Sequence, residues 1–468
     1  MTATNGVSKA PGCIPAPNPG QTFWQQDGNI EFSDYRSTET LPEQTDILII
    51  GAGYAGTSTA YHLLAEGTKN SITILEARGV CSGATGRNGG HLRPDLYGHI
   101  PTYIERAGLE AAVEIAEFEI AHVPAMKKFI REQGIDCDFN LCRSIDVWCN
   151  EQSAQNAKTV YGQMVAHGLS YMEDVVFYTG KEAEGISGVK GAKACASYTA
   201  ASMSPYKFII HLTKLILASE QVNLQTHTPA VSILPDPSGG YTVDTSRGKI
   251  HADTIIHANN AYVSGLLPEY EKNIIPCKGI ACHIAVPDGT KAPLLNNSYI
   301  NRTEDNTLSY LIGRNDGGIV VGGAAAKFKP FKYQWYNNVD DSILIDAAKD
   351  YYNDYMQRTY HGWDNSGAAV RQIWSGVMGY SYDSHPHIGS VPNKPGQYIN
   401  AGFNGHGMPV IWLSAKGLAK MIAHGAPFEK CGIPRLFQTS QLRIDRAQNG
   451  TEGKGDILGT ASFGATKQ

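Results

Sequence analysis

The chain has 468 residues, 42% of them hydrophobic and 18% charged, which is typical of a globular enzyme and excludes a disordered or fibrous protein. Its formal net charge is −5, and neither sign forms long runs, which argues against nucleic acid or an anionic membrane as a partner. The length exceeds that of one ordinary core and predicts two domains. The 50 glycines exceed the ~7% usual in proteins and indicate tight turns and close backbone approaches.

No targeting or metal-binding signal stands out. No stretch approaches the roughly 18 apolar residues of a membrane span, and the first residues lack the apolar core of a secretory signal. We therefore expect a soluble, cytoplasmic protein with no membrane partner. The nine cysteines are an odd number without a paired CxxC, so we expect reduced thiols and no metal site.

The N-terminal quarter of the chain begins with an arm and continues into a nucleotide-binding pattern. Residues 1–43 are rich in proline, glycine and polar residues, with Phe23 and Trp24 as anchors, and predict an arm laid over the body. From Thr45 an apolar strand ends in glycines, a helical pattern follows, and residues 71–75 read as a second strand. This order predicts a strand, turn, helix, strand unit.

Further elements follow from apolar periodicity and from glycine turns. We expect a long helix over 109–133, a hairpin over 239–262, strands over 310–314 and 317–323, a helix over 338–361, and from 398 a strand, a glycine-rich turn and a helix that ends at Gly425.

A GxGxxG motif directly follows the predicted buried strand and begins the predicted helix. This is the position that the motif has in dinucleotide-binding proteins. Gly51 permits the tight turn, Gly53 lets the backbone approach the pyrophosphate, and Gly56 lets helix and strand pack closely. Glu76 ends the second strand, where its carboxylate can accept hydrogen bonds from the adenosine ribose and would repel the extra phosphate of NADP. These elements predict a dinucleotide site but do not distinguish NAD from FAD.

Two glycine-rich loops and three shorter motifs identify the family. The segments LEARGVCSGATGRNGGH (75–91) and GFNGHGM (402–408), together with TSRG (245–248), ANNAY (258–262) and PCKG (276–279), resemble the D-amino-acid oxidase and sarcosine oxidase superfamily, particularly its fungal and putrescine-oxidase-like members. The resemblance extends over about residues 45 to 425 in the family's order. It implies FAD as the cofactor.

The resemblance also implies the fold, an α/β protein in which a Rossmann-like FAD-binding domain is interleaved with an α+β substrate domain built on a mixed sheet. We expect residues 1–95, 196–275 and 365–468 to form the FAD-binding domain and residues 96–195 and 276–364 to form the substrate domain. The active site is expected at their junction.

The residues expected to bind FAD are those of the motifs and of the segments that the resemblance aligns with them. They are Gly51, Gly53, Tyr54, Ala55, Gly56, Glu76, Ala77, Arg78, Ala84, Thr85, Arg87, Asn88, Gly89, Gly90, Ala230, Ala258, Asn259, Asn404, Gly405, His406, Gly407 and Met408.

The loop 402–408 and the attachment of the flavin carry two more specific expectations. A helix beginning near Met408 and Pro409 would direct its positive end at the reduced flavin. The cysteine and the histidine that hold flavin covalently in some relatives fall near Gly376 and at Arg87 here, so we expect non-covalent FAD, with Cys81 and Cys277 as the remaining exceptions.

A cation for a substrate carboxylate is the first catalytic candidate. Arg93 could clamp such a carboxylate, and it could equally be a surface arginine that pairs with Asp95. In sarcosine-oxidase-like relatives a lysine after the glycine loop helps to hold the carboxylate, but this chain has Pro409 there. The substrate then lacks the carboxylate, or Arg93 holds it alone.

The other candidates are His406, which could approach the flavin edge or serve the loop conformation, and three aromatic residues. Trp374, Tyr380 and Tyr382 could wall an amine pocket, or they could fill the core as aromatic residues usually do.

These observations favour an oxidase of a small amine or amino-acid-like substrate. Hydride would pass from the carbon next to nitrogen to flavin N5, giving an imine, and O2 would reoxidise the flavin to give H2O2. A flavin-dependent dehydrogenase or monooxygenase and a non-catalytic flavin-binding protein remain the alternatives. The sequence leaves the oligomeric state open.

Overall fold

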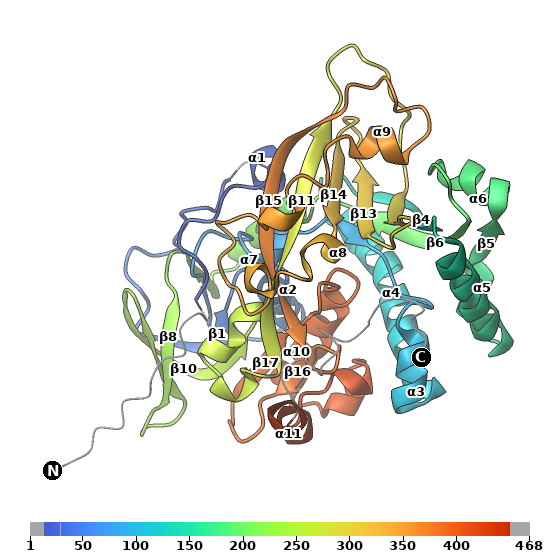
Figure 1. Cartoon of the computed structure of the whole chain (residues 1–468). Coiled ribbons are helices and arrows are strands. Elements are labelled where there is room, and N and C mark those ends of the chain that lie inside the picture. Colours follow the sequence, from blue (N-terminus) through green and yellow to red (C-terminus); the bar gives the residue numbers. More distant parts are fainter. Residues whose placement is uncertain (1–13, 29, 450–468) are drawn as a thin grey trace.

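Two β-sheets and a layer of helices make up the computed structural model, which describes residues 14–28 and 30–449 (Figure 1). Residues 1–13, 29 and 450–468, which include the start of the predicted arm, lie outside the described residues. Because the two sheets come from interleaved segments, the predicted α/β class and its two-sheet, interleaved arrangement are confirmed.

The first sheet holds the dinucleotide motif. Its main strands run in the order β16-β17-β10-β1-β2-β7, parallel except for the edge strand β16, and β9 and β8 extend β10 as an antiparallel ribbon. Its strands are β1 (Gln44–Ile50), β2 (Ile72–Leu75), β7 (Val222–Gln225), β8 (Ala230–Pro235), β9 (Tyr241–Thr245), β10 (Gly248–His257), β16 (His387–Ser390) and β17 (Gln397–Ala401).

The second sheet is mixed, as predicted. Its strands run in the order β15-β11-β14-β13-β12-β4-β6-β3, with β5 paired to β6, and only the β12–β4 pair is parallel among the described strands of this sheet. Its strands are β3 (His91–Leu92), β4 (Asn140–Trp148), β5 (Val176–Thr179), β6 (Ala194–Ser202), β11 (Ile274–Ala285), β12 (Ser298–Arg302), β13 (Leu308–Gly313), β14 (Ile319–Gly323) and β15 (Ala369–Ser381).

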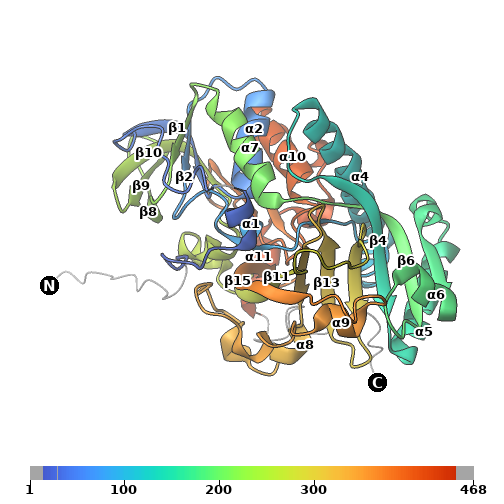
Figure 2. The ribbon, with the colours of Figure 1, turned by 90° about the horizontal axis from the view of Figure 1, so that it is seen from above.

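Three helices pack side by side beside the first sheet, as seen from above in Figure 2: α2 (Tyr54–Ala65), α7 (Pro205–Leu217) and α10 (Ile411–His424). The long helix α4 (Leu109–Glu132) lies next to α10 and follows α3 (Ile100–Ala107). The remaining helices are α1 (Phe23–Asp27), α5 (Glu151–Ala166), α6 (Gly180–Ser187), α8 (Ala325–Phe328), α9 (Tyr355–Thr359) and α11 (Gln441–Asn449). None of the helices in the described residues is long and apolar enough to cross a bilayer.

Sheet membership differs from the predicted domain boundaries at β3, β6 and β15. The predicted division assigns these strands to the FAD-binding domain, but they lie in the second sheet. The reason is pairing, since β6 pairs with β4 along its whole length and β15 pairs with β11 over nearly all of its own. The chain therefore crosses between the sheets before β3, after β6 and after β15, not at residues 96, 196 and 365.

The helix predicted over 338–361 is wrong, although its apolar spacing is real. Ile345, Ala348, Tyr352 and Met356 are all buried, as on one face of a helix. The backbone is nonetheless mostly turns, and only α9 is α-helical; Asp354, directly before it, adopts a left-handed conformation with φ of 52° that an α-helix cannot continue through. The other predicted strands and helices named above are present, and Gly425 ends α10 with φ of 62°.

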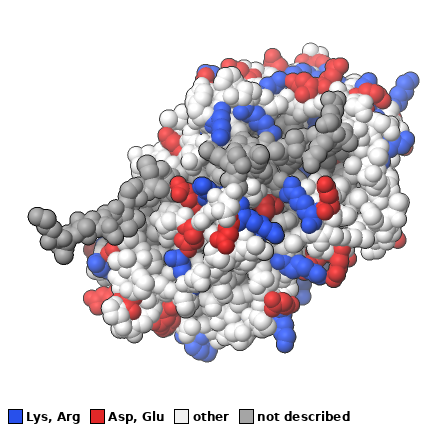
Figure 3. Space-filling model, turned by 60° about the horizontal axis from the view of Figure 1, so that its bottom comes forward, with Lys and Arg blue, Asp and Glu red and all other residues white. Residues whose placement is uncertain are grey.

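The described part of the arm lies against the body, as predicted. Trp24 is fully buried in α1, and its indole Nε1 donates to Asn88 O at 2.7 Å. Phe23 stacks on the ring of His283 at a centroid distance of 3.8 Å. These contacts fix the arm beside the glycine loop of residues 83–90. On the face drawn in Figure 3, basic and acidic side chains lie interspersed.

Candidate active site

The GxGxxG turn forms a cradle whose open side faces a cavity. Gly51 has φ of 109°, and a Cβ there would lie 2.8 Å from Ala258 O, so only glycine fits. A Cβ on Gly56 would lie 1.9 Å from Gly51 O, so this glycine allows α2 to pack against β1 as predicted. A Cβ on Gly53 would meet only Thr85 Oγ1, at 3.3 Å, because its remaining space belongs to the cavity. Gly53 precedes α2 and has no side chain to cap it; Tyr54 N donates to Thr85 Oγ1 at 3.1 Å, and the rest of the helix N-terminus is left to a ligand anion.

The carboxylate of Glu76 is fixed at the end of β2. Its Oε2 accepts from Ala52 N at 2.8 Å and its Oε1 from Arg78 N at 2.9 Å. Each carboxylate oxygen can accept a further hydrogen bond, and Glu76 lines the cavity, so it can still receive hydroxyl donors from a ribose. Nearby Asn259 also lines the cavity, and its buried Oδ1 has no hydrogen-bond partner among the described residues.

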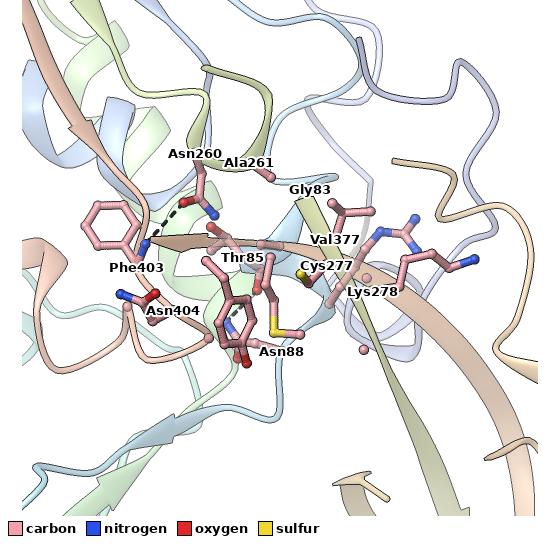
Figure 4. Close-up of a pocket in the computed structure, with 18 of the residues that line it drawn as sticks. Gly83, Thr85, Asn88, Asn260, Ala261, Cys277, Lys278, Val377, Phe403 and Asn404 are labelled. Atoms are coloured by element: carbon pink, nitrogen blue, oxygen red, sulfur yellow. Dashed lines mark hydrogen bonds between the residues drawn. The ribbon is translucent and has the colours of Figure 1, made fainter. Parts of the chain in front are cut away.

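Four segments meet at the centre of the cavity, shown in Figure 4. Gly83, Thr85 and Asn88 come from the first glycine loop, Cys277 and Lys278 from β11, and Val377 from β15, while Phe403 and Asn404 belong to the loop after β17. Asn404 ties this last loop to β15, because its Oδ1 accepts from Ser381 N at 2.7 Å. Asn260 holds the same loop through its Oδ1, which accepts from Gly402 N at 2.9 Å.

The cavity measures about 1730 Å³, more than the roughly 300–1,000 Å³ typical of a site for one drug-sized ligand. It therefore has room for a dinucleotide and a small substrate. All of the predicted cofactor residues line it except Gly56, which packs helix on strand, and Gly90, whose backbone has φ of 77° and approaches Met203 O. The lining set includes Ala230 on β8 and the predicted residues of the loop 402–408.

Of the three aromatic residues predicted to wall an amine pocket, only Tyr380 lines the cavity. A Cβ on Gly405 would lie 3.0 Å from the hydroxyl oxygen of Tyr380. Trp374 is 2% exposed, lies outside the cavity lining and donates from Nε1 to Arg87 O at 2.9 Å. It therefore fills the core, which was the alternative to a place in the pocket wall. Tyr382 also lies outside the lining, because it follows the end of β15.

The helix after the second glycine loop begins later than predicted. Gly407 O accepts from both Val410 N and Ile411 N, so a turn intervenes and α10 starts at Ile411 rather than at Met408. Leu413 N in its first turn donates to His122 Nε2 at 3.1 Å. This part of the helix N-terminus is therefore occupied by protein, and its action on a flavin remains a prediction.

Two arginines of the first glycine segment form a buried ion cluster with Asp341, which we call the loop cluster. Arg78 Nη1 lies 2.9 Å from Asp341 Oδ1, and Arg87 Nε lies 3.2 Å from Asp341 Oδ2. Arg87 also donates to the backbone oxygens of Ser82, Ser375 and Gly20. Since every nitrogen of Arg87 has a protein acceptor, its predicted contact with pyrophosphate or flavin oxygens is not what this geometry favours.

A second set of ion pairs borders the cavity beyond the glycine loops, and we call it the wall cluster: Arg93–Asp146, His99–Asp95 and His406–Glu119. Arg93 Nη1 lies 3.5 Å from Asp146 Oδ1 and donates to the hydroxyl of Tyr198, so Asp146, and not the expected Asp95, is its ion-pair partner. Burial disfavours its charge, but Tyr198 and Asp146 outweigh this and raise the pKa of Arg93.

The other two pairs of the wall cluster each join a cavity-lining histidine to a more deeply buried carboxylate. His99 Nδ1 lies 2.5 Å from Asp95 Oδ2, and His406 Nε2 lies 2.7 Å from Glu119 Oε2. Burial opposes the charge on His99, but the Asp95 carboxylate outweighs it and raises the pKa of His99. Asp95 N also donates to Glu119 Oε2 at 2.7 Å, which links the two carboxylates.

The floor of the cavity is the second sheet. His91 accepts from or donates to Ser298 Oγ at 2.7 Å, and burial lowers the pKa of His91 to about 3, so its ring is neutral. Farther along the sheet, Arg302 is 4% exposed and lies over the ring of Trp148 at 4.8 Å. Tyr310 on β13 also lines the cavity, and its ring lies edge-on to His91 at a centroid distance of 5.3 Å.

Glu119, Asp146 and Asp341 contribute to the site but were not predicted from the sequence. Glu119 had a detectable signal, because it interrupts the apolar stripe of α4 formed by Ala112, Ala116, Val123 and Met126. Asp341 had none, since it lies 263 residues from its partner Arg78.

The residues present fit an FAD molecule. The open cradle at Gly53, the uncapped start of α2 and the buried acceptor of Asn259 suit the nucleotide end, and the glycine loops leave space for the ring. Cys81 and Cys277 also line the cavity, but burial raises the pKa of Cys277 to about 12 and that of Cys81 well above its usual value. The described residues contain no cluster that could hold a metal ion.

Known proteins agree with this geometry. The family described as DAO, FAD dependent oxidoreductase, matches residues 46–421. The chain is 23% identical to gamma-glutamylputrescine oxidoreductase of Escherichia coli (strain K12), covering 83% of this chain and 86% of that protein. Its fold is similar to glycine oxidase from Geobacillus kaustophilus, with a TM-score of 0.68, 19% identity and coverage of 85% and 99% of the two chains. L-proline dehydrogenase from P. horikoshii has a TM-score of 0.66 at 19% identity, covering 85% and 98%.

The family match extends from the first strand of the dinucleotide motif to the last helix beside it, and so includes both glycine loops and the whole second sheet. The chain therefore belongs to the DAO family of FAD-dependent oxidoreductases.

Proposed function

We propose that the protein oxidises a carbon–nitrogen bond in a small amine or amino-acid-like substrate. The observation that carries this proposal is the continuity of the cavity, which runs from the dinucleotide cradle past both glycine loops to the wall cluster. A small molecule beside the wall cluster therefore lies next to the predicted position of the flavin. The names of the relatives, which include a glutamylated putrescine, glycine and proline, support an amine or amino acid there.

Bound FAD would supply a two-electron acceptor that takes a hydride at N5 from the carbon next to nitrogen, leaving an imine. The protein's part is to bind the amine, orient it and keep water away. The cavity wall suits this task, because Tyr380 and Tyr310 offer apolar faces and the charged side chains are mostly paired with one another.

Whether the substrate carries a carboxylate depends on Arg93. Its guanidinium already contacts Asp146 and Tyr198, so a substrate carboxylate would share it with a protein carboxylate. Together with Pro409 in place of the relatives' lysine, this favours an amine without a carboxylate beside the nitrogen. Arg93 nevertheless lines the cavity, and it remains the named anchor for an amino-acid substrate.

The experiment is anaerobic mixing of the holoenzyme with γ-glutamylputrescine, glycine and L-proline. We expect at least one to bleach the visible flavin absorbance without NAD(P)H. A monooxygenase would instead require NAD(P)H for reduction, and a non-catalytic flavoprotein would not be reduced by any amine. Admission of air then tests the acceptor: O2 as acceptor gives one H2O2 per flavin, whereas a dehydrogenase recovers its colour only with an added electron acceptor.

FAD attachment is tested separately. We expect acid or heat to release intact FAD into the supernatant, because the cavity-lining thiols are protonated. Colour that remains with the precipitate would contradict non-covalent attachment.

A further inference from the structure

His406 and Glu119 form a histidine–carboxylate pair beside the predicted flavin. His406 lies in the loop between β17 and α10, lines the cavity and exposes 33% of its side chain. Glu119 comes from the middle of α4, and only 5% of its side chain is exposed. The pair therefore has one exposed, titratable end in the cavity and one buried anionic end.

The hydrogen bonds fix which nitrogen of His406 can accept a proton. Glu119 Oε2 accepts from Asp95 N at 2.7 Å, and the same oxygen lies 2.7 Å from His406 Nε2. A carboxylate oxygen accepts, so Nε2 carries the hydrogen. The neutral ring then has its lone pair on Nδ1, and no described residue makes a hydrogen bond to that atom. The arrangement is that of an oriented general base.

The other titratable groups that face His406 are His122 on the same helix as Glu119 and Asp95 in the segment after β3. His122 donates from Nδ1 to Phe118 O and accepts at Nε2 from Leu413 N, and burial lowers the pKa of His122 to about 4, so it is neutral. The carboxylates near His406 are thus those of Glu119 and Asp95, and Asp95 is itself paired with His99.

An amine substrate needs such a base. An alkylammonium group with a pKa near the 10.4 of lysine is neutral in fewer than about one molecule in a thousand at pH 7. Only the neutral amine can release hydride from the neighbouring carbon, because its nitrogen lone pair stabilises the developing positive charge. A proton acceptor in the cavity therefore increases the reactive population.

We propose that His406 takes the proton from the bound substrate ammonium, and that Glu119 positions and stabilises it. The N–H bond of the ammonium breaks, the electron pair stays on nitrogen, and the proton passes to Nδ1. Bound FAD would accept the hydride from the adjacent carbon, and the imidazolium returns its proton to solvent. His406 is the catalytic residue and Glu119 the positioning residue; the inference rests on the proposed amine oxidation.

The first test measures, in the absence of catalysis, how Glu119 affects the imidazole of His406. In holoenzyme carrying ¹³C-labelled histidine rings, with His406 assigned by its loss in His406→Gln, the His406 signal is titrated by NMR. Glu119→Gln is expected to change the response of this signal to pH, since the carboxylate within hydrogen-bond reach of Nε2 is removed. Glu117→Gln, on the exposed face of the same helix, is the matched control and should leave it unchanged.

The second test measures anaerobic flavin reduction by γ-glutamylputrescine, glycine or L-proline, whichever reduces the wild type, against pH. His406→Gln should slow reduction about 100-fold at pH 7 and recover as rising pH supplies neutral amine, which a folding defect would not do. Glu119→Gln should shift the acidic limb of the profile to lower pH.

The outcomes separate the inference from the function it rests on. If amines reduce the flavin and His406→Gln has the wild-type pH profile, the inference is overturned and amine oxidation stands. If Glu119→Gln leaves the His406 titration unchanged, the positioning role is overturned. If no amine reduces the wild-type flavin, the proposed function fails and takes the inference with it.

Discussion

The loop cluster and the wall cluster border the same cavity, but they differ in how far their charged groups are buried and bonded to other groups of the protein. In the loop cluster the side chains of Arg78, Arg87 and Asp341 are 4%, 1% and 0% exposed, and backbone oxygens accept from several arginine nitrogens, whereas Arg78 Nε has no hydrogen-bond partner among the described residues. In the wall cluster His99 and His406 are 41% and 33% exposed, and a ring nitrogen of each lies against a carboxylate.

The loop cluster is therefore suited to holding segments of the protein together, and the wall cluster to acting on a substrate. A closed cluster joins segments far apart in the chain, here the first glycine loop, the described arm and the segment after β14 through Asp341. Both of its arginines are paired with Asp341 inside the protein. An open cluster keeps polar atoms oriented toward the cavity, as chemistry on a substrate requires. We therefore expect substitutions in the loop cluster to change cofactor retention, and those in the wall cluster to change reactivity.

The largest effect is expected at the cofactor cradle. Gly53→Val should abolish FAD binding, because its side chain would occupy the cavity beside the start of α2, where the pyrophosphate approaches the backbone. The measurement is the ratio of flavin absorbance to protein after purification. Gly162→Val, at an exposed glycine of α5 with open space around it, is the matched control. Stoichiometric FAD in Gly53→Val would place the nucleotide elsewhere.

Asp341→Asn tests the closed cluster. It leaves two buried arginines without their anion, a change that typically costs about 3–5 kcal/mol. We expect a lower melting temperature and FAD dissociation faster by at least about tenfold. Asp340→Asn is the matched control, because this neighbouring carboxylate accepts from Ser342 and contacts neither arginine. Equal FAD retention in both variants would contradict a holding role for Asp341.

Arg93 tests whether the open cluster holds a substrate carboxylate. Arg93→Gln should destabilise the fold by about 1–3 kcal/mol, because Asp146 is buried and loses its charged partner. Adding Asp146→Asn should restore stability if the pair is structural. For glycine, kcat/KM should fall at least roughly 30-fold if Arg93 also holds its carboxylate, with far less effect on a plain amine. A similar loss for both substrates would remove the carboxylate role.

The sequence was sufficient where a motif is contiguous and fixed by backbone geometry. Gly51, Gly53 and Gly56 could be assigned separate roles because each role follows from a missing Cβ at a set distance from a strand end. Asp341 could not be found, because no local pattern marks the partner of a distant arginine. Glu119 lies between these cases, since a charge within an apolar helical stripe is visible in the sequence but its partner is not.

Two errors have the same physical origin, which is backbone conformation that apolar periodicity does not encode. The helix over 338–361 is interrupted at Asp354, and α10 is delayed to Ile411 by the turn that Gly407 O closes. Sheet membership is likewise not encoded in apolar periodicity, because β6 and β15 belong to the second sheet through pairing with β4 and β11, which are distant in sequence.

The smallest expected effect concerns pH and the His99–Asp95 pair. The pKa of His99 is raised, so its protonation stabilises the fold below the unfolded value of about 6.5, and this stabilisation is lost as pH rises through the raised pKa. The pKa of Asp95 is lowered, because His99 and its other partners outweigh the opposing effect of burial, so its stabilisation is lost only in acid, below about 3.9. Since 41% of His99 is exposed, solvent screens the pair, and we expect about 0.2–1 kcal/mol. The free energy of unfolding, measured with denaturant at about pH 6 and about pH 9, should therefore fall less between the two in His99→Gln than in the wild type. His424→Gln, which removes a surface pair with Glu66 at 2.8 Å, serves as the comparison. If His99→Gln keeps the wild-type dependence above pH 6, the pair does not link protonation to folding.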